Sequence, residues 1–169
     1  MESLNNKMNT SKYFQVGKNN IGYIGLNFQE HFLDTEFEIP KKLKLQHKVL
    51  ERGMTAKEIL EEFKPQESNL GELAWALKNY KKLLKNGYAN IFYIRDKKGT
   101  LWTVYAYWHV GRGWNVDAYP VTNPDEWNAG SQVVSQVFSV LDSLDSGDLE
   151  KRVKELEKDM ERLRKIINL

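Results

Sequence analysis

A chain of 169 residues with 41% hydrophobic and 28% charged side chains can bury a self-sufficient core, which argues against a disordered or fibrous protein. The absence of cysteine excludes disulfides, thiolate catalysis and thiolate metal sites. No run of about 18 apolar residues occurs, so we expect an intracellular, cytoplasmic protein that does not associate with a membrane.

Charge is unevenly distributed, although the net charge is only +2. Residues 78–98 contain seven basic side chains and the single acid Asp96, whereas residues 30–38 contain four acids and no Lys or Arg. Two segments of opposite charge can steer a charged partner toward the protein. Charged side chains that are simply solvated at the surface are, however, the commoner explanation for such clusters.

The N-terminal third has weak local signals. We predict a flexible segment over residues 1–12, followed by one domain over residues 13–145. Residues 13–28 are rich in Gly, Asn, aromatic and β-branched side chains, which is typical of short strands or an irregular hairpin around Asn19 and Asn20. Residues 41–52 carry mixed strand and helix signals and receive no assignment.

Two helices follow. Thr55 and Glu58 have the spacing of a capping box, which predicts a short helix over residues 56–63 before Pro65. Ser68 is the predicted start of a longer helix that ends at Asn86-Gly87. Its apolar residues recur at spacings of three and four, and they are Leu70, Leu73, Leu77, Tyr80 and Leu84.

Residues 89–119 are predicted to form a three-stranded antiparallel meander with strands at 89–95, 100–109 and 114–119. The register that we expect pairs Trp108 with Trp114, Ala106 with Val116, and Val104 with Ala118 on the face toward the core. The opposite face carries tyrosine rings with polar hydroxyl groups beside other polar side chains. Its residues are Thr103, Tyr105, Tyr107, His109, Asn115, Asp117 and Tyr119.

Residues 131–145 are interpreted as a further helix, capped by Ser131, because their apolar residues keep a helical period. The β-branched content leaves a strand as the alternative. The predicted fold class is therefore α+β: a three-stranded antiparallel meander packed by helices, followed by a C-terminal coiled-coil helix.

That last helix, residues 148–169, is the strongest prediction from the sequence. Its apolar residues follow spacings of 4, 3, 4, 3 and 4, which is a heptad repeat with β-branched residues and Met160 at position a and leucine at position d. The repeat comprises Leu149, Val153, Leu156, Met160, Leu163 and Ile167. In a parallel pair Arg152 would face Glu157 and Asp159 would face Arg164, with opposite charges both times. We therefore expect a parallel homodimer, with a trimer or a helix docked on its own domain as alternatives.

Signals for chemistry are sparse. His31, His47 and His109 match no metal-ligand spacing, and no nucleophile motif or phosphate-binding loop occurs, so we predict no metal and no cofactor, and a non-enzymatic protein is favoured over an enzyme. If the chain is an enzyme, His109 and Asp117 are the candidate catalytic residues, because both project from the polar face of the meander.

Two functional hypotheses follow. The first is a non-enzymatic homo-oligomeric protein-interaction or assembly module, and an accessory protein of a virus or mobile element would fit this role, although no residue pattern demonstrates that origin. The alternative is a single-stranded nucleic-acid-binding protein that stacks bases on Tyr105, Tyr107 and Tyr119 and contacts phosphates through turn residues. The turn residues in question are Lys97, Lys98 and Arg112.

Overall fold

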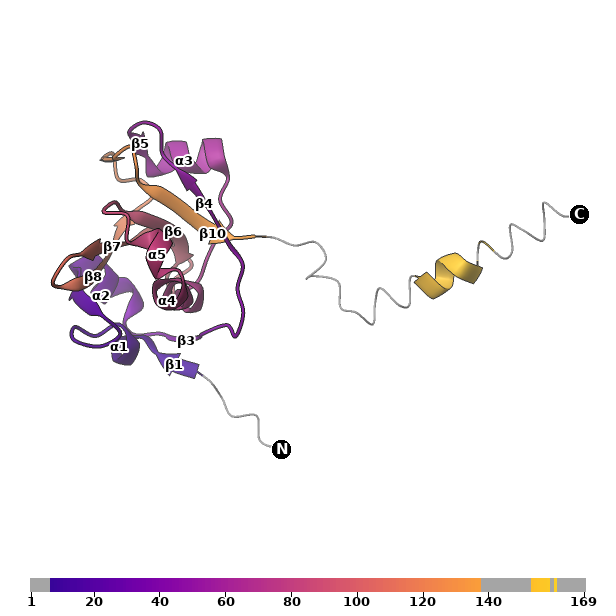
Figure 1. The fold of residues 1–169 in the computed structure, drawn as a ribbon, viewed down its shortest axis with the longest axis horizontal. Coiled ribbons are helices and arrows are strands. Elements are labelled where there is room, and N and C mark those ends of the chain that lie inside the picture. The colour runs from indigo at the N-terminus through magenta and orange to yellow at the C-terminus, as the bar shows by residue number, and fades with distance from the viewer. Residues whose placement is uncertain (1–6, 138–152, 159, 161–169) are drawn as a thin grey trace, which may run out of the picture. The chain divides into compact units, whose positions relative to one another are not determined.

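A computed structural model describes residues 7–137, 153–158 and 160. The chain divides into two units, residues 1–137 and residues 138–169, and each is described by itself. In the first unit the structure confirms an α+β fold (Figure 1).

The first unit contains ten strands and five helices within its described residues. The strands are β1 (Lys7–Asn9), β2 (Ile21–Ile24), β3 (Glu36–Glu38), β4 (Leu45–Val49), β5 (Met54–Thr55), β6 (Asn90–Arg95), β7 (Leu101–His109), β8 (Gly113–Pro120), β9 (Glu126–Trp127) and β10 (Gln132–Gln136). The helices are α1 (Thr10–Tyr13), α2 (Leu26–Phe32), α3 (Ala56–Phe63), α4 (Leu70–Asn79) and α5 (Lys81–Leu84).

A six-stranded mixed sheet with the order β2-β8-β7-β6-β10-β4 organises this domain. The predicted meander forms its centre, since β6 pairs antiparallel with β7 and β7 with β8. The predicted register is confirmed, with Trp108 opposite Trp114 and Val104 opposite Ala118. The meander is thus three strands of a larger sheet, to which β2 and β10 add in parallel on either side and β4 adds antiparallel at the edge.

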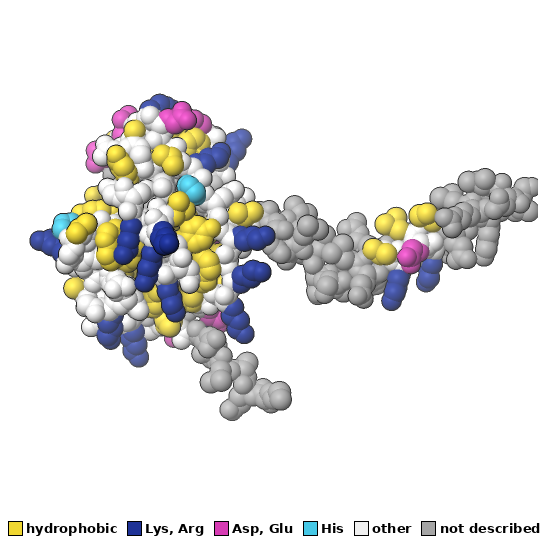
Figure 2. All heavy atoms as spheres, viewed as in Figure 1, with side chains coloured by type: hydrophobic (Ala, Val, Ile, Leu, Met, Phe, Trp, Pro, Cys, Tyr) yellow, Lys and Arg dark blue, Asp and Glu magenta, His cyan; other side chains and the backbone are white. Residues whose placement is uncertain are grey.

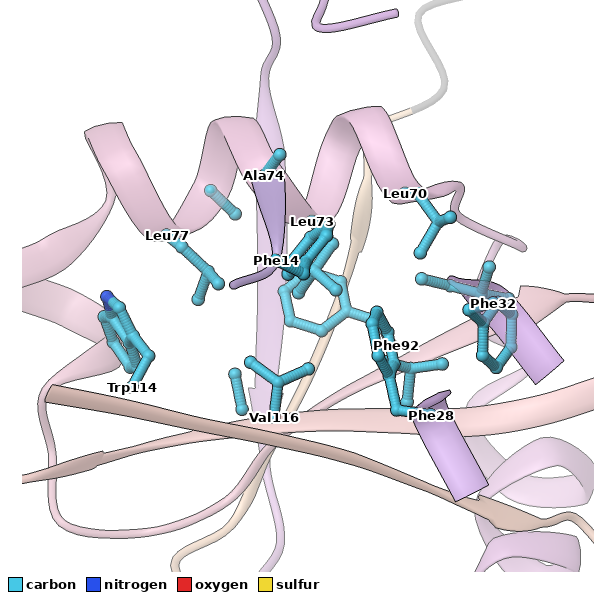
Figure 3. Packing of buried hydrophobic residues seen from close by; sticks show 14 of the residues in the cluster. Phe14, Phe28, Phe32, Leu70, Leu73, Ala74, Leu77, Phe92, Trp114 and Val116 are labelled. Carbon is cyan, nitrogen blue, oxygen red and sulfur yellow. The ribbon is translucent and has the colours of Figure 1, made fainter. Parts of the chain in front are cut away.

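The main core lies between one face of this sheet and α4. In Figure 3, Leu70, Leu73 and Leu77 of α4 extend toward Phe92 and other side chains of the sheet. Additional aromatic side chains come from α1 and α2 and fill the same layer, namely Tyr13, Phe14, Phe28 and Phe32. Burial of this apolar stripe is what stabilises α4, because helices of this length are marginal in isolation.

A smaller apolar cluster lies on the other face of the sheet, beneath α3. Ile91 and Tyr93 point to this side, whereas their neighbour Phe92 points to the main core. The Tyr93 hydroxyl donates a hydrogen bond to the carbonyl of Ala56 at 2.8 Å, and burial raises the pKa of this phenol. Strand β6 is therefore covered on both faces, while β7 and β8 are covered fully on only one.

The helix predicted over residues 56–63 is confirmed as α3, with both hydrogen bonds of the capping box present between Thr55 and Glu58. The longer helix differs from the prediction. It begins one residue later, because the side chain of Asn69 rather than Ser68 caps it, and it is interrupted at Tyr80, so that α4 and α5 are separate.

The prediction of a helix over residues 131–145 is wrong where the structure describes it. Residues 132–136 form β10, which lies between β6 and β4, and Ser131 is buried rather than acting as a helix cap. Val133 and Val134 face opposite sides of the sheet, in separate apolar clusters. Residues 138–145 lie outside the described residues.

The N-terminal third contains more regular structure than its sequence signals indicated. Residues 7–12, predicted to precede the domain, form β1 and most of α1. The hairpin considered around Asn19 and Asn20 is a tight turn instead, in which both residues have positive φ, and the strand that follows pairs in parallel with β8. The unassigned stretch 41–52 contains the edge strand β4.

In the second unit, residues 153–158 and 160 are helical, as predicted for this part of the chain. The rest of the predicted coiled-coil helix, residues 148–152, 159 and 161–169, lies outside the described residues. No helix among the described residues is long and apolar enough to cross a lipid bilayer.

Candidate functional site

The surface of β7 and β8 that faces away from the main core is the candidate binding face predicted from the sequence. We name it the tyrosine face, after Tyr105, Tyr107 and Tyr119, which are all half-buried. Tyr105 and Tyr119 stack with ring centroids 5.4 Å apart and an interplanar angle of 13°. Burial, the hydroxyl of Tyr119 and the carboxylate of Asp117 raise the pKa of Tyr105, so this phenol stays protonated.

Part of the tyrosine face is covered by the protein itself. Trp127 of β9 packs edge-on against Tyr105 at 5.1 Å and lies 5.9 Å from Tyr119. Thr103 is fully buried, and its hydroxyl donates to the carbonyl of Tyr119. The sequence analysis did not place Trp127 over this surface, because β9 reaches it through a pairing with β5 that no local pattern encodes.

The other end of the tyrosine face is open. Tyr107 lies opposite Asn115, and Tyr23 of β2 is the next residue across the sheet, with half of its surface exposed. The side-chain oxygen of Asn115 is buried there without a hydrogen-bond partner among the described residues. Tyr23 was missing from the sequence prediction because the parallel pairing of β2 with β8 joins residues about 90 positions apart.

Asp117 has a structural role on this face. Its carboxylate accepts hydrogen bonds from the backbone N–H of Phe28, at 3.3 Å, and of Ala118, at 2.8 Å. A Cβ atom at Gly25, the N-cap of α2, would overlap this carboxylate, so the glycine permits the close approach. Asp117 thereby caps α2 from a neighbouring strand, a position that favours an anion.

The two candidate catalytic residues are far apart. His109 lies opposite Gly113 and Asp117 lies opposite Tyr105, a difference of four residues along the strand pair, or about 13 Å. His109 Nδ1 is 2.8 Å from the carbonyl oxygen of Val110, and this ring is partly exposed. The arrangement brings no base to a carboxylate and places no nucleophile between them.

The three cations assigned to the tyrosine face lie at its two ends. Lys97 and Lys98 belong to the β6–β7 turn, whereas Arg112 belongs to the β7–β8 turn at the other end of β7. Lys97 forms an ion pair with Asp34 at 2.7 Å. The acidic segment 30–38 and the basic segment 78–98 therefore neutralise each other at this contact.

A second contact between these segments joins His31 to Asp96. His31 Nδ1 lies 3.5 Å from the Asp96 carboxylate, and its ring lies 4.0 Å from that of Trp102. Burial opposes ionisation of Asp96, but hydrogen bonds from Thr100, Trp102 and Lys98 outweigh it, so the pKa of this carboxyl is lowered. The pair was invisible in the sequence, where 64 residues separate its members.

Metal-binding geometry is absent from the part of the chain that the structure describes: no group of three or more His, Asp or Glu side chains converges there. His31, His47 and His109 belong to separate elements, α2, β4 and β7.

The described helical residues of the second unit carry an exposed apolar stripe. Val153, Leu156 and Met160 are 50%, 64% and 54% exposed. Figure 2 shows hydrophobic side chains on one side of this segment and charged ones on the other. Glu157 is also described and exposed. The remaining predicted oligomerisation residues, Leu149, Arg152, Asp159, Leu163, Arg164 and Ile167, lie outside the described residues.

Comparisons of this chain with protein-family models, with curated proteins and with solved structures gave no match.

Proposed function

We propose that this protein is a homo-oligomeric interaction and assembly module, in which residues 148–169 pair two copies in a parallel coiled coil. The observation that carries the proposal is the exposed apolar stripe of Val153, Leu156 and Met160, which occupies successive a, d and a positions. Burying side chains of this kind contributes about 1.5–3 kcal/mol each, and a single helix of this length is marginal in water without such burial.

Charge complementarity supports a second copy as the partner for this stripe. In a parallel, in-register pair each g residue meets the e residue five positions later on the other chain. Arg152 then meets Glu157, and Asp159 meets Arg164, so each pair joins opposite charges. A helix packed on its own domain has no need of this pattern.

Pairing through the C-terminal helix would present two copies of the domain together. The open end of the tyrosine face, with Tyr23, Tyr107 and Asn115, supplies the aromatic side chains that protein contacts favour. Assembly and partner contact are then separable properties: Tyr107→Ala should leave the oligomeric mass unchanged, since this residue belongs to the domain and not to the heptad repeat.

The test of self-association is the solution mass of the full chain carrying Leu156→Asp, measured by light scattering over a range of concentrations. A charge at a d position should convert a dimer to a monomer. The matched control is Lys158→Asp, which introduces the same side chain at the outward-facing f position two residues away and should leave the dimer intact. Equal masses for the wild type and Leu156→Asp, both monomeric, would contradict the proposal. A trimeric wild-type protein would support self-association but would correct the proposed oligomeric state from dimer to trimer.

Orientation can be tested because the chain has no cysteine of its own. In a parallel, in-register pair, the two copies of each d residue lie next to each other at the interface between the helices. Leu149→Cys should therefore form an interchain disulfide nearly completely under mild oxidation. Glu155→Cys, at the outward-facing c position, is the control and should stay uncross-linked. An antiparallel pair would give no Leu149→Cys dimer, because this residue would face the opposite end of the partner helix.

A further inference from the structure

A pocket of about 520 Å³ lies on the side of the domain opposite the tyrosine face, between α1, the turn before β2 and the junction of α4 with α5. Three lysines line it, Lys12, Lys78 and Lys81, and no acidic residue does. The rest of the lining consists of Asn19 and Asn20 and of the apolar or aromatic residues Met8, Tyr13, Ile39 and Leu77. The lining therefore carries a charge of +3 with amide groups beside it.

The backbone around this pocket is held by specific hydrogen bonds. The side-chain amide of Asn19 donates to the carbonyl of Tyr13 at 3.0 Å, and the carbonyl of Asn20 accepts from the backbone N–H of Trp114 at 2.7 Å. The Tyr13 hydroxyl donates to the carbonyl of Ala74 in α4. These bonds tie the turn and α1 to the sheet and α4, so the walls of the pocket are preorganised.

The interruption of the helix at Tyr80 lies at the pocket. It ends α4 at Asn79 and starts α5 at Lys81, and Lys78 and Lys81 on either side of the break both line the pocket, as residues three apart in a helix also would. Lys82 and Lys85 continue the basic surface along α5, and the Lys85 ammonium lies 3.4 Å from the centre of the Trp108 ring. Figure 2 shows Lys and Arg side chains spread over the face that carries α4 and α5, with acidic side chains gathered mainly at the α3 end.

These lysines, like several other lysines of the domain, form no ion pair with a described carboxylate. Arg52, Arg95 and Lys97 each form an ion pair with a carboxylate. Among the described carboxylates, none lies within 4.0 Å of the ammonium group of Lys12, Lys78, Lys81 or Lys82. Like charges gathered in this way repel one another, and a bound polyanion would relieve that repulsion.

The chemistry of the surface favours a phosphate chain as this polyanion. Lys78, Lys81, Lys82 and Lys85 follow one another from the end of α4 through α5, so several phosphates of one strand can meet successive lysines. The most exposed apolar side chains of the domain, Leu26 and Val110, belong to α2 and to the β7–β8 turn, whereas the pocket is lined by Met8, which is 38% exposed. One partly exposed methionine offers little apolar surface for insertion into a lipid bilayer.

We propose that the pocket and the adjoining lysines of α5 bind the sugar–phosphate backbone of nucleic acid without sequence preference, with Lys12, Lys78 and Lys81 holding one phosphate. The site belongs to the domain alone, so it does not depend on pairing of the C-terminal helices. Two copies in a dimer would raise the affinity for long strands through avidity.

The test is fluorescence anisotropy of a labelled single strand of about 20 nucleotides titrated with the full chain at salt concentrations between about 50 and 200 mM. We expect affinity to fall with salt with a log–log slope of about −2 to −3, as for three or four phosphate contacts. The variant Lys78→Glu/Lys81→Glu should weaken binding at least about tenfold and reduce the slope by about 1–2.

The matched control is Lys98→Glu/Arg112→Glu, which makes the same change of charge in exposed turns beside the tyrosine face. This control should weaken binding much less, and a larger loss than in Lys78→Glu/Lys81→Glu would overturn the proposal in favour of the tyrosine face. Lys78→Ala/Lys81→Ala, with folding checked by circular dichroism, should weaken binding in the same direction if the charge reversal perturbs the fold.

Three further outcomes would also overturn the inference: no binding of the oligonucleotide at the lowest salt concentration, binding to phosphatidylserine vesicles but not to the oligonucleotide, or loss of all binding in the monomeric Leu156→Asp chain. If the chain fails to dimerise but still binds with the same dependence on Lys78 and Lys81, the nucleic-acid site stands and only the proposed assembly function fails.

Discussion

Helix α4 and the helical residues 153–158 and 160 have the same kind of amphipathic sequence, but their apolar side chains differ in exposure. Leu73 and Leu77 of α4 are buried against the sheet, whereas Val153 and Leu156 have at least half of their surface exposed. An amphipathic pattern thus predicts that the apolar face of a helix is buried against another surface, but it does not identify that surface. The apolar face of α4 is buried against the sheet of the same chain. For the C-terminal segment we propose that the C-terminal helix of a second copy buries it.

The largest expected effect that separates the two helices is on the stability of the domain. Leu73→Ala should lower the free energy of unfolding by about 2–5 kcal/mol, because it leaves a cavity under α4. Leu156→Ala should leave domain unfolding unchanged. Urea unfolding followed by tryptophan fluorescence measures this difference, since all five tryptophans lie in the domain. A comparable loss in both variants would mean that the C-terminal helix packs on the domain.

A smaller effect concerns the buried end of α4, where Glu72 is largely inaccessible to water. Burial raises the pKa of this carboxyl, against the hydrogen bond that the side chain of Asn69 donates to it, and one of its oxygens has no partner among the described residues. A raised folded-state pKa means that the stabilising contribution is complete below the unfolded value of 4.5 and is lost as pH rises through the folded value. Glu72→Gln should therefore stabilise the domain by about 1 kcal/mol at pH 7 and have little effect near pH 4.

The control for this pH dependence is Glu58→Gln in the capping box of α3. Hydrogen bonds from the backbone and side chain of Thr55 lower the pKa of Glu58, so its contribution is present above the unfolded value and is lost in acid. Glu58→Gln should destabilise the domain at pH 7 and lose that effect in acid, opposite to Glu72→Gln. Thermal unfolding at the two pH values compares the signs, and a shared sign would refute the assignment of Glu72.

Local patterns in the sequence were sufficient where neighbours in the chain are also neighbours in space. The capping box at Thr55 and the register of Trp108 with Trp114 both depend on residues a few positions apart, and both predictions are confirmed. In each case a short turn or a single helical turn fixes the geometry.

Predictions failed or gave no answer where the deciding partner is remote. Residues 132–136 keep a helical period, but β4 and β6 offer two sets of backbone hydrogen bonds that only the folded chain brings together. The β-branched pair Val133 and Val134 was the signal that could have favoured a strand. For the same reason the sequence did not predict that Tyr23 belongs to the tyrosine face. It also did not predict the basic pocket, whose lysines come from α1, α4 and α5.

The smallest predicted effect concerns the charged pairs that would flank the apolar stripe of the C-terminal helix in a parallel dimer. Arg152→Glu would place like charges opposite each other in a parallel dimer and weaken it by roughly 0.5–1 kcal/mol. Adding Glu157→Arg to the same chain should restore the affinity. Sedimentation equilibrium of the two variants measures this coupling, and a double variant no tighter than the single one would remove the support that these charges give to a parallel pair.

The most direct test of self-association is the solution mass of the full chain compared with that of a chain ending at Asp145, both measured by light scattering at the same concentrations. We expect twice the chain mass for the full-length protein, and a folded monomer for the truncated chain, because the domain has its own core and the apolar stripe of Val153, Leu156 and Met160 is removed. A full-length protein that is monomeric at every concentration would contradict the account and leave the stripe to be covered by some other surface.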